Sequence, residues 1–297
     1  MTIPPDEAAL PPVSPAPLAP DQHFPLRWLP VFLALAACLV LPIAVAMAGT
    51  EVLSPAKHGF MLHAGWFYLG VVLWFAACAR RAGMSLSRSL GRAPDANAVF
   101  EGVSSAWLHL LANGAVLLVV IGLLARFHPP MLEQFISRSS EGFEFGESPL
   151  WLQAAVVVGL APLAEELLFR GVLLHRFTRR IGMTRGIVLS SALFGIMHMN
   201  PLAITVFGVL LCVLHLRSRS LLATTLAHAI NNSIPLVMLS MTDDSARGKV
   251  PGASEVASMA DGLWIGLALA AVTTLLLFLW LKPRWPAKDA SMPWQQA

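Results

Sequence analysis

Long apolar runs separated by short polar segments dominate the sequence. A transmembrane helix needs about 20 mostly apolar residues, and about eight runs meet or approach that length: 28–48, 62–79, 104–125, 150–175, 186–199, 201–216, 220–241 and 262–281. The fifth and sixth runs are short and are joined by the turn at Asn200 and Pro201, which predicts a hairpin that barely reaches the far interface. The pattern predicts an all-α polytopic membrane protein with about eight transmembrane helices.

The composition also favours a membrane protein. Of the 297 residues, 56% are hydrophobic and 12% are charged, whereas soluble domains carry about 25% charged residues. A soluble fold of this length could not bury so much apolar surface. The net charge of +3 is explained by membrane topology, so nucleic acid is not an expected partner.

The positions of the runs divide the chain into four segments. Residues 1–26 contain eight prolines, which predicts a disordered tail. Residues 27–149 hold the first three predicted helices, and residues 150–241 hold the fourth to the seventh. Residues 242–297 hold an outer loop, the last predicted helix and a short tail.

Basic residues indicate which side of the membrane each segment faces. With the N-terminus inside, 14 of the 20 Lys and Arg residues fall in cytoplasmic segments and 5 fall in outer ones. This bias follows the positive-inside rule. We therefore expect both termini in the cytoplasm.

A few ionisable residues interrupt the apolar runs, and such residues are costly in a membrane and usually functional. Counted from the cytoplasmic ends of their runs at about 1.5 Å per residue, Glu165 lies about 16 Å deep, His198 about 20 Å and His228 about 14 Å. Three separate runs thus place polar groups in one layer. This coincidence predicts a single buried polar site enclosed by the helices.

The spacing of these residues assigns them to faces. Glu166 and Arg170 are four residues apart, as in a helical ion pair. Glu165 is rotated by about 100° from Glu166, so we expect the two carboxylates to face different partners. His228 and Asn232 are also four residues apart and share one face. Glu165 is therefore the carboxylate available for chemistry.

Two kinds of chemistry fit this set of residues. In the first, Glu165 is the general base toward a water that His198 also holds, while His228 and Asn232 donate to the oxyanion of a tetrahedral intermediate. This hydrolysis requires no cofactor. In the second, Glu165, His198 and His228 bind a divalent metal such as zinc, for which a carboxylate and two imidazoles are familiar ligands. Asn232 is a poor zinc ligand, which favours the first mechanism.

Three motifs resemble those of one family of intramembrane proteases. Residues 165–170 read EELLFR, residues 194–198 read FGIMH and residues 228–232 read HAINN, which fit EExxxR, FxxxH and HxxxN. In this order they resemble the CPBP (CaaX protease and bacteriocin-processing, Abi) family, which contains the eukaryotic CaaX prenyl endopeptidases and many bacterial relatives. The resemblance makes residues 150–241 the protease core.

The resemblance implies a role for each motif residue. It implies that Glu165 and His198 position the water and that His228 and Asn232 form the oxyanion hole. It also implies that Glu166 and Arg170 are structural. We interpret Phe194 as a wall residue that keeps the site shaped and dry.

These features together predict an intramembrane endopeptidase, similar to the CaaX prenyl proteases and glutamate- or metal-dependent. Its expected partners are the lipid bilayer and a peptide or membrane-protein substrate, with or without a lipid anchor. Its expected location is the inner (plasma) membrane of a bacterium. The alternative is a non-catalytic membrane protein, such as an immunity, sorting or transport factor, in which the same polar layer is structural.

Overall fold

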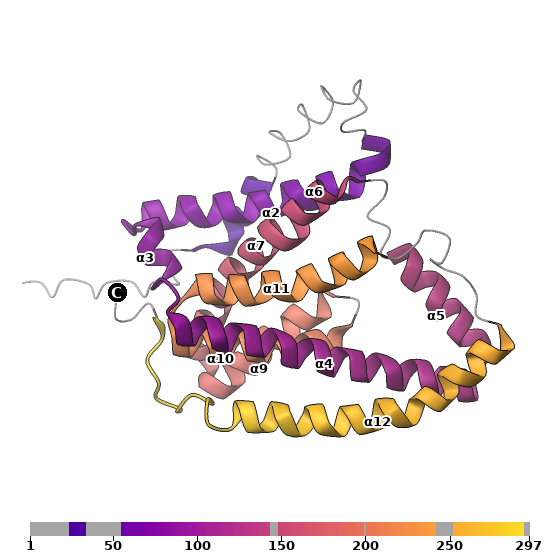
Figure 1. Cartoon of the computed structure of the whole chain (residues 1–297). Coiled ribbons are helices and arrows are strands. Elements are labelled where there is room, and N and C mark those ends of the chain that lie inside the picture. The colour runs from indigo at the N-terminus through magenta and orange to yellow at the C-terminus, as the bar shows by residue number, and fades with distance from the viewer. Residues whose placement is uncertain (1–23, 34–54, 143–147, 199, 242–251, 294–297) are drawn as a thin grey trace, which may run out of the picture.

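The computed structural model describes residues 24–33, 55–142, 148–198, 200–241 and 252–293, and within these ranges the regular elements are all helical (Figure 1). The predicted all-α membrane fold is therefore confirmed. Six of the helices in the described ranges are long and apolar enough to cross a membrane. The predicted number of eight is approximate, because most of the first run lies outside the described residues and the fifth run forms a shorter helix.

The first half of the described chain contains two long and three shorter helices before the central segment. Its elements are η2 (Leu26–Trp28), α2 (Pro55–Arg81), α3 (Leu86–Leu90), α4 (Ala96–Phe127) and α5 (Pro129–Gly142). Asp95 caps the start of α4, because its side chain accepts a hydrogen bond of 2.7 Å from the Ala98 amide. Helix α5 lies between the third and fourth predicted helices.

Most of the predicted disordered tail, residues 1–23, lies outside the described residues. The last residues of that tail are nevertheless part of the core. Phe24 is fully buried, with its ring 4.7 Å from that of Phe75 and 6.1 Å from that of Trp74. The Trp74 indole also donates a hydrogen bond to the carbonyl of Pro25. The chain is thus anchored to α2 immediately before η2.

The fourth predicted helix forms a continuous rod over Leu150–Ile181. It is built of α6 (Leu150–Gln153), η3 (Ala154–Leu160), α7 (Ala161–Leu168), η4 (Phe169–Leu173) and α8 (Leu174–Ile181). The segments η3 and η4 are π-helical, a geometry that often marks functional sites. The two adjacent glutamates of α7 therefore lie between two widened stretches of one helix.

A tight hairpin follows, formed by α9 (Met183–Ile196) and α10 (Pro201–Ser218). As predicted, the turn is at Asn200 and Pro201, where Asn200 caps α10. The two helices approach closely because glycines line the contact: a Cβ atom on Gly195 would lie 2.5 Å from the Pro201 carbonyl oxygen, and one on Gly208 2.9 Å from the Cβ of Ser191. Any larger side chain at these positions would force the hairpin apart.

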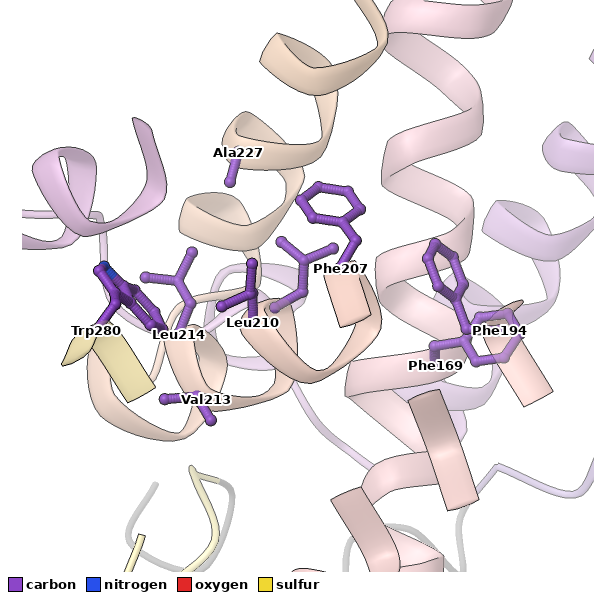
Figure 2. Close-up of a cluster of buried hydrophobic side chains, with 9 residues drawn as sticks. Phe169, Phe194, Phe207, Leu210, Val213, Leu214, Ala227 and Trp280 are labelled. Atoms are coloured by element: carbon purple, nitrogen blue, oxygen red, sulfur yellow. The ribbon is translucent and has the colours of Figure 1, made fainter. Parts of the chain in front are cut away.

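The last two helices, α11 (Leu221–Ser240) and α12 (Ala253–Leu281), complete the bundle. Helix α12 lies along α4, while α11 contacts both α4 and α7, and α2 packs on the outer side of α7 (Figure 1). A buried apolar cluster joins the central rod, the hairpin, α11 and α12 (Figure 2); its labelled members are Phe169, Phe194, Phe207, Leu210, Val213, Leu214, Ala227 and Trp280. Phe194 and Phe207 are the members of this cluster that contact the histidines of the candidate active site.

Candidate active site

Glu166 is fully buried and lies at the bottom of the site. Its Oε1 atom accepts a hydrogen bond of 2.9 Å from Arg170, which is itself fully buried. Arg170 also donates to the carbonyl oxygen of Gly208 at 3.2 Å, which ties the central rod to α10. The predicted ion pair between Glu166 and Arg170 is thus confirmed.

His228 of α11 lies between the two adjacent glutamates. Its Nδ1 atom is 3.0 Å from Oε1 of Glu166, and its Nε2 atom is 3.7 Å from Oε2 of Glu165. The expectation that the two carboxylates face different partners is therefore wrong. The reason is that the two nitrogens of one imidazole point in different directions, so a single ring contacts both carboxylates of one helical turn.

His198 lies in the loop after α9 and not on the predicted helix, because α9 ends at Ile196. The Nδ1 atom of His198 is 2.8 Å from the carbonyl oxygen of Phe194, one of the carbonyls that a helix end leaves without a backbone partner. Its Nε2 atom is 3.8 Å from Oε2 of Glu165. The loop thus directs the second imidazole toward the same carboxylate oxygen as His228.

Glu165 is therefore the point at which the site converges. Its Oε2 atom faces the Nε2 atoms of both histidines and has no hydrogen-bond partner among the described residues. Its Oε1 atom accepts a hydrogen bond of 2.9 Å from the hydroxyl of Tyr68 in α2. The exposed fraction of the Glu165 side chain is 14% and that of His198 is 32%, against 4% for His228. The Oε2 atom itself is buried, and His198 is the more exposed of the two histidines that face it.

Asn232 lies one turn beyond His228 on α11 and contacts the rod. Its Nδ2 atom donates a hydrogen bond of 3.0 Å to the carbonyl oxygen of Val157 in η3. In a π-helical register this carbonyl would pair with the amide five residues later, and Pro162 has no amide hydrogen there. Asn232 thus satisfies a carbonyl that the proline leaves free. One N–H of its amide group remains for another acceptor.

Aromatic rings surround the polar groups and exclude water from one side. The ring of Phe194 lies 4.5 Å from the guanidinium of Arg170, 4.8 Å from the ring of His198 and 5.6 Å from that of His228. Phe207 packs edge-to-face against His228 at 5.6 Å. These contacts agree with the interpretation of Phe194 as a wall residue and add Phe207, which no motif indicates.

The hydrogen bonds assign the protons of both imidazoles. A carboxylate and a carbonyl oxygen can only accept, so Nδ1 of His228 and Nδ1 of His198 are the donors to Glu166 and Phe194. Each Nε2 atom consequently faces Glu165, as a lone pair in a neutral ring or as a second donor in a protonated one. The cluster contains two carboxylates and one guanidinium, so one further positive charge would bring its net charge to zero.

Metal donors are present but are not arranged as a metal centre. Glu165, His198 and His228 are the residues that could contribute to one, with both imidazole Nε2 atoms within 4 Å of the carboxylate. Among the described side chains, no group of three or more His, Cys, Asp or Glu residues is arranged to hold a metal ion.

The fold and the site together define a polytopic membrane protein with a carboxylate held between two imidazoles in its interior. Residues 147–234 match the family model described as type II CAAX prenyl endopeptidase Rce1-like. This segment therefore belongs to the CPBP family, which confirms the predicted resemblance. The match supports a membrane endopeptidase that acts on a peptide, and with the apolar helices it makes the chain an integral membrane protein.

The matched segment contains all the candidate site residues named from the sequence, but not Tyr68 of α2. Neither the search of curated proteins nor that of solved structures found a match to the chain.

Proposed function

We propose that the protein is an intramembrane endopeptidase that hydrolyses a peptide bond with a water activated by Glu165 and His198. One observation carries this proposal: the buried Oε2 atom of Glu165 lies 3.8 Å from Nε2 of His198 and 3.7 Å from Nε2 of His228, next to the partly exposed side chain of His198. A carboxylate in this position can accept a proton from a water that His198 also holds.

The reaction follows from these positions. Glu165 takes one proton from the water while the water oxygen attacks the peptide carbonyl carbon, which gives a tetrahedral intermediate with a negatively charged oxygen. The C–N bond then breaks, and the proton on Glu165 passes to the leaving amine. The products are a carboxylic acid and an amine, and the carboxylate of Glu165 is regenerated.

We assign the oxyanion hole to His228 and Asn232. The Nε2 atom of His228 donates to an oxyanion when the ring carries two protons, because Nδ1 already donates to Glu166. In that form the two carboxylates, the Arg170 guanidinium and the imidazolium sum to zero charge. Asn232 contributes the N–H that Val157 does not use. Glu166 and Arg170 are thus supporting residues that hold the oxyanion donor.

This mechanism does not require a metal. Protonated His228 cannot bind a metal ion through Nε2, and an Asn side chain is a poor ligand for zinc. In the competing arrangement both histidines would be neutral, and Glu165, His198 and His228 would hold a divalent metal such as zinc that activates the water. The two arrangements differ in whether removal of metal abolishes cleavage.

For the substrate we propose a peptide or membrane protein that reaches the site within the bilayer, with or without a lipid anchor. We further propose the inner membrane of a bacterium as the location, with both termini in the cytoplasm. The distribution of the basic residues supports this orientation.

The decisive experiment compares wild-type protein with Glu165→Gln and His198→Ala in proteoliposomes. The probe is a fluorogenic peptide ending in Cys-aliphatic-aliphatic-X, in farnesylated and unmodified forms. New peptide termini in bacterial membranes incubated with each variant are identified in parallel by mass spectrometry. We expect cleavage by the wild type alone. Equal sets of termini from the wild type and a folded Glu165→Gln variant would favour the non-catalytic alternative.

A further inference from the structure

Tyr68 is the sole tyrosine of the chain, and its hydroxyl lies in the candidate active site. It donates a hydrogen bond of 2.9 Å to Oε1 of Glu165. Helix α2, which contains it, lies outside the family match over residues 147–234. The contact joins two positions that are 97 residues apart.

Packing contacts hold the ring of Tyr68 in place independently of the hydrogen bond to Glu165. Its side chain packs against an apolar cluster that contains Leu152 and Val156 of the central rod, and its ring lies edge-to-face at 5.5 Å from that of Phe67. The phenol is rigid beyond its two side-chain torsions. The hydroxyl position is therefore determined by the packing of α2 on the rod.

The carboxylate of Glu165, by contrast, is not fixed by its own torsions. The last torsion of a Glu side chain is broad and does not select one orientation. The bond from Tyr68 holds Oε1, and Oε2 then faces the Nε2 atoms of His198 and His228 at 3.8 and 3.7 Å. Without this bond the carboxylate could rotate away from the position that a water must reach.

We propose that Tyr68 is a positioning residue of the reaction, which orients Glu165 through Oε1 so that Oε2 acts as the base. This inference rests on the proposed function. It makes α2 part of the active site, although the family match does not include it. It also gives Tyr68 a role distinct from packing, because the hydroxyl and not the ring makes the contact with Glu165.

Two substitutions distinguish the contribution of the Tyr68 hydroxyl from that of its ring. Tyr68→Phe keeps the ring and removes the hydroxyl, whereas Tyr68→Leu removes both. We expect Tyr68→Phe to lower kcat by about 10- to 100-fold, since small misplacements of a catalytic group have effects of this size, with KM and thermal stability close to wild type. A packing role would instead leave Tyr68→Phe fully active and impair Tyr68→Leu alone. That result would overturn the proposal.

A matched control is available between α4 and α12. The Ser104 hydroxyl accepts a hydrogen bond of 3.1 Å from the indole of Trp280, which links α4 to α12. Ser104→Ala removes one hydroxyl between two helices, as Tyr68→Phe does, but far from Glu165 in the chain and on other elements. We expect it to leave kcat unchanged. The substrate is the reporter peptide or a peptide identified from the new termini.

A second readout does not depend on a substrate. A hydrophobic carbodiimide modifies carboxyl groups in membrane proteins, and mass spectrometry measures modification of Glu165 directly. We expect modification several times faster in Tyr68→Phe than in wild type, because Oε1 is no longer engaged; equal rates would overturn the proposal. If the wild type cleaves nothing while the modification rates differ, the proposed function fails and the position of Tyr68 stands.

Discussion

The two adjacent glutamates are expected to respond differently to the same substitution, Glu165 mainly in activity and Glu166 mainly in stability. Glu165→Gln replaces the base by an amide of the same shape. Its Oε1 atom still accepts from Tyr68, so the packing of α2 on the rod is retained. Loss of a general base lowers rates by about 10² to 10⁴-fold. We therefore expect a folded and inactive protein.

Glu166→Gln acts mainly on stability. The Oε1 atom of Glu166 is the acceptor for both Arg170 at 2.9 Å and His228 at 3.0 Å, and the side chain is fully buried. Removing one partner of a buried ion pair costs about 3–5 kcal/mol, which for a protein of this size lowers the melting temperature by roughly 10 °C. The amide also introduces two N–H donors where Oε2 has no partner among the described residues.

The double variant Glu166→Gln, Arg170→Gln provides the control for this reasoning. It removes the uncompensated guanidinium, so we expect it to recover part of the lost stability but not the activity, because His228 still lacks its carboxylate. The assays are thermal unfolding in detergent and turnover of the reporter peptide. If Glu165→Gln keeps near-normal turnover while Glu166→Gln is stable and inactive, the roles of the two carboxylates are reversed.

Three further predictions test the remaining assignments. Asn232→Ala should lower kcat by about 10²-fold or more, as expected for one oxyanion donor, whereas Asn231→Ala should change it far less; the reverse order would place the donor at Asn231. Chelation should leave activity of the purified protein intact, and stoichiometric zinc whose removal and return switch activity off and on would refute the metal-free mechanism. In a cysteine-free background, cysteines at Ser87 and Gln134 should be labelled from the cytoplasm and from outside, respectively, and labelling of both from one side would contradict the proposed topology.

The helices and the layer of polar residues could be predicted because they depend on local sequence. Six of the about eight predicted runs correspond to long apolar helices in the described ranges, and the spacing of Glu166 and Arg170 predicts their ion pair directly. The turn at Asn200 and Pro201 is also local, since a proline favours the first turn of a helix and an asparagine caps it.

The contacts that give the site its chemistry were not predictable in the same way. The hydrogen bond from Tyr68 joins α2 to the rod, and an isolated tyrosine in an apolar run carries no motif. The location of His198 after α9 depends on where the helix ends, which is the least certain feature of any sequence-based assignment. The π-helical segments on both sides of the glutamates depend on packing and on the proline at position 162.

The adjacent glutamates show that the tertiary position of one imidazole ring determines which partners the two carboxylates contact. On a helix their side chains diverge by about 100°, which by itself predicts separate partners. An imidazole from α11 lies between them and contacts each with a different nitrogen, at 3.0 Å for Glu166 and 3.7 Å for Glu165. Because Nδ1 of His228 donates its proton in the hydrogen bond to Glu166, Nε2 faces Glu165 either as a lone pair or as a second N–H donor. In the proposed mechanism Glu166 therefore acts through His228. Because Glu166 is buried and paired with Arg170, Glu165 is the carboxylate that we propose as the base toward water.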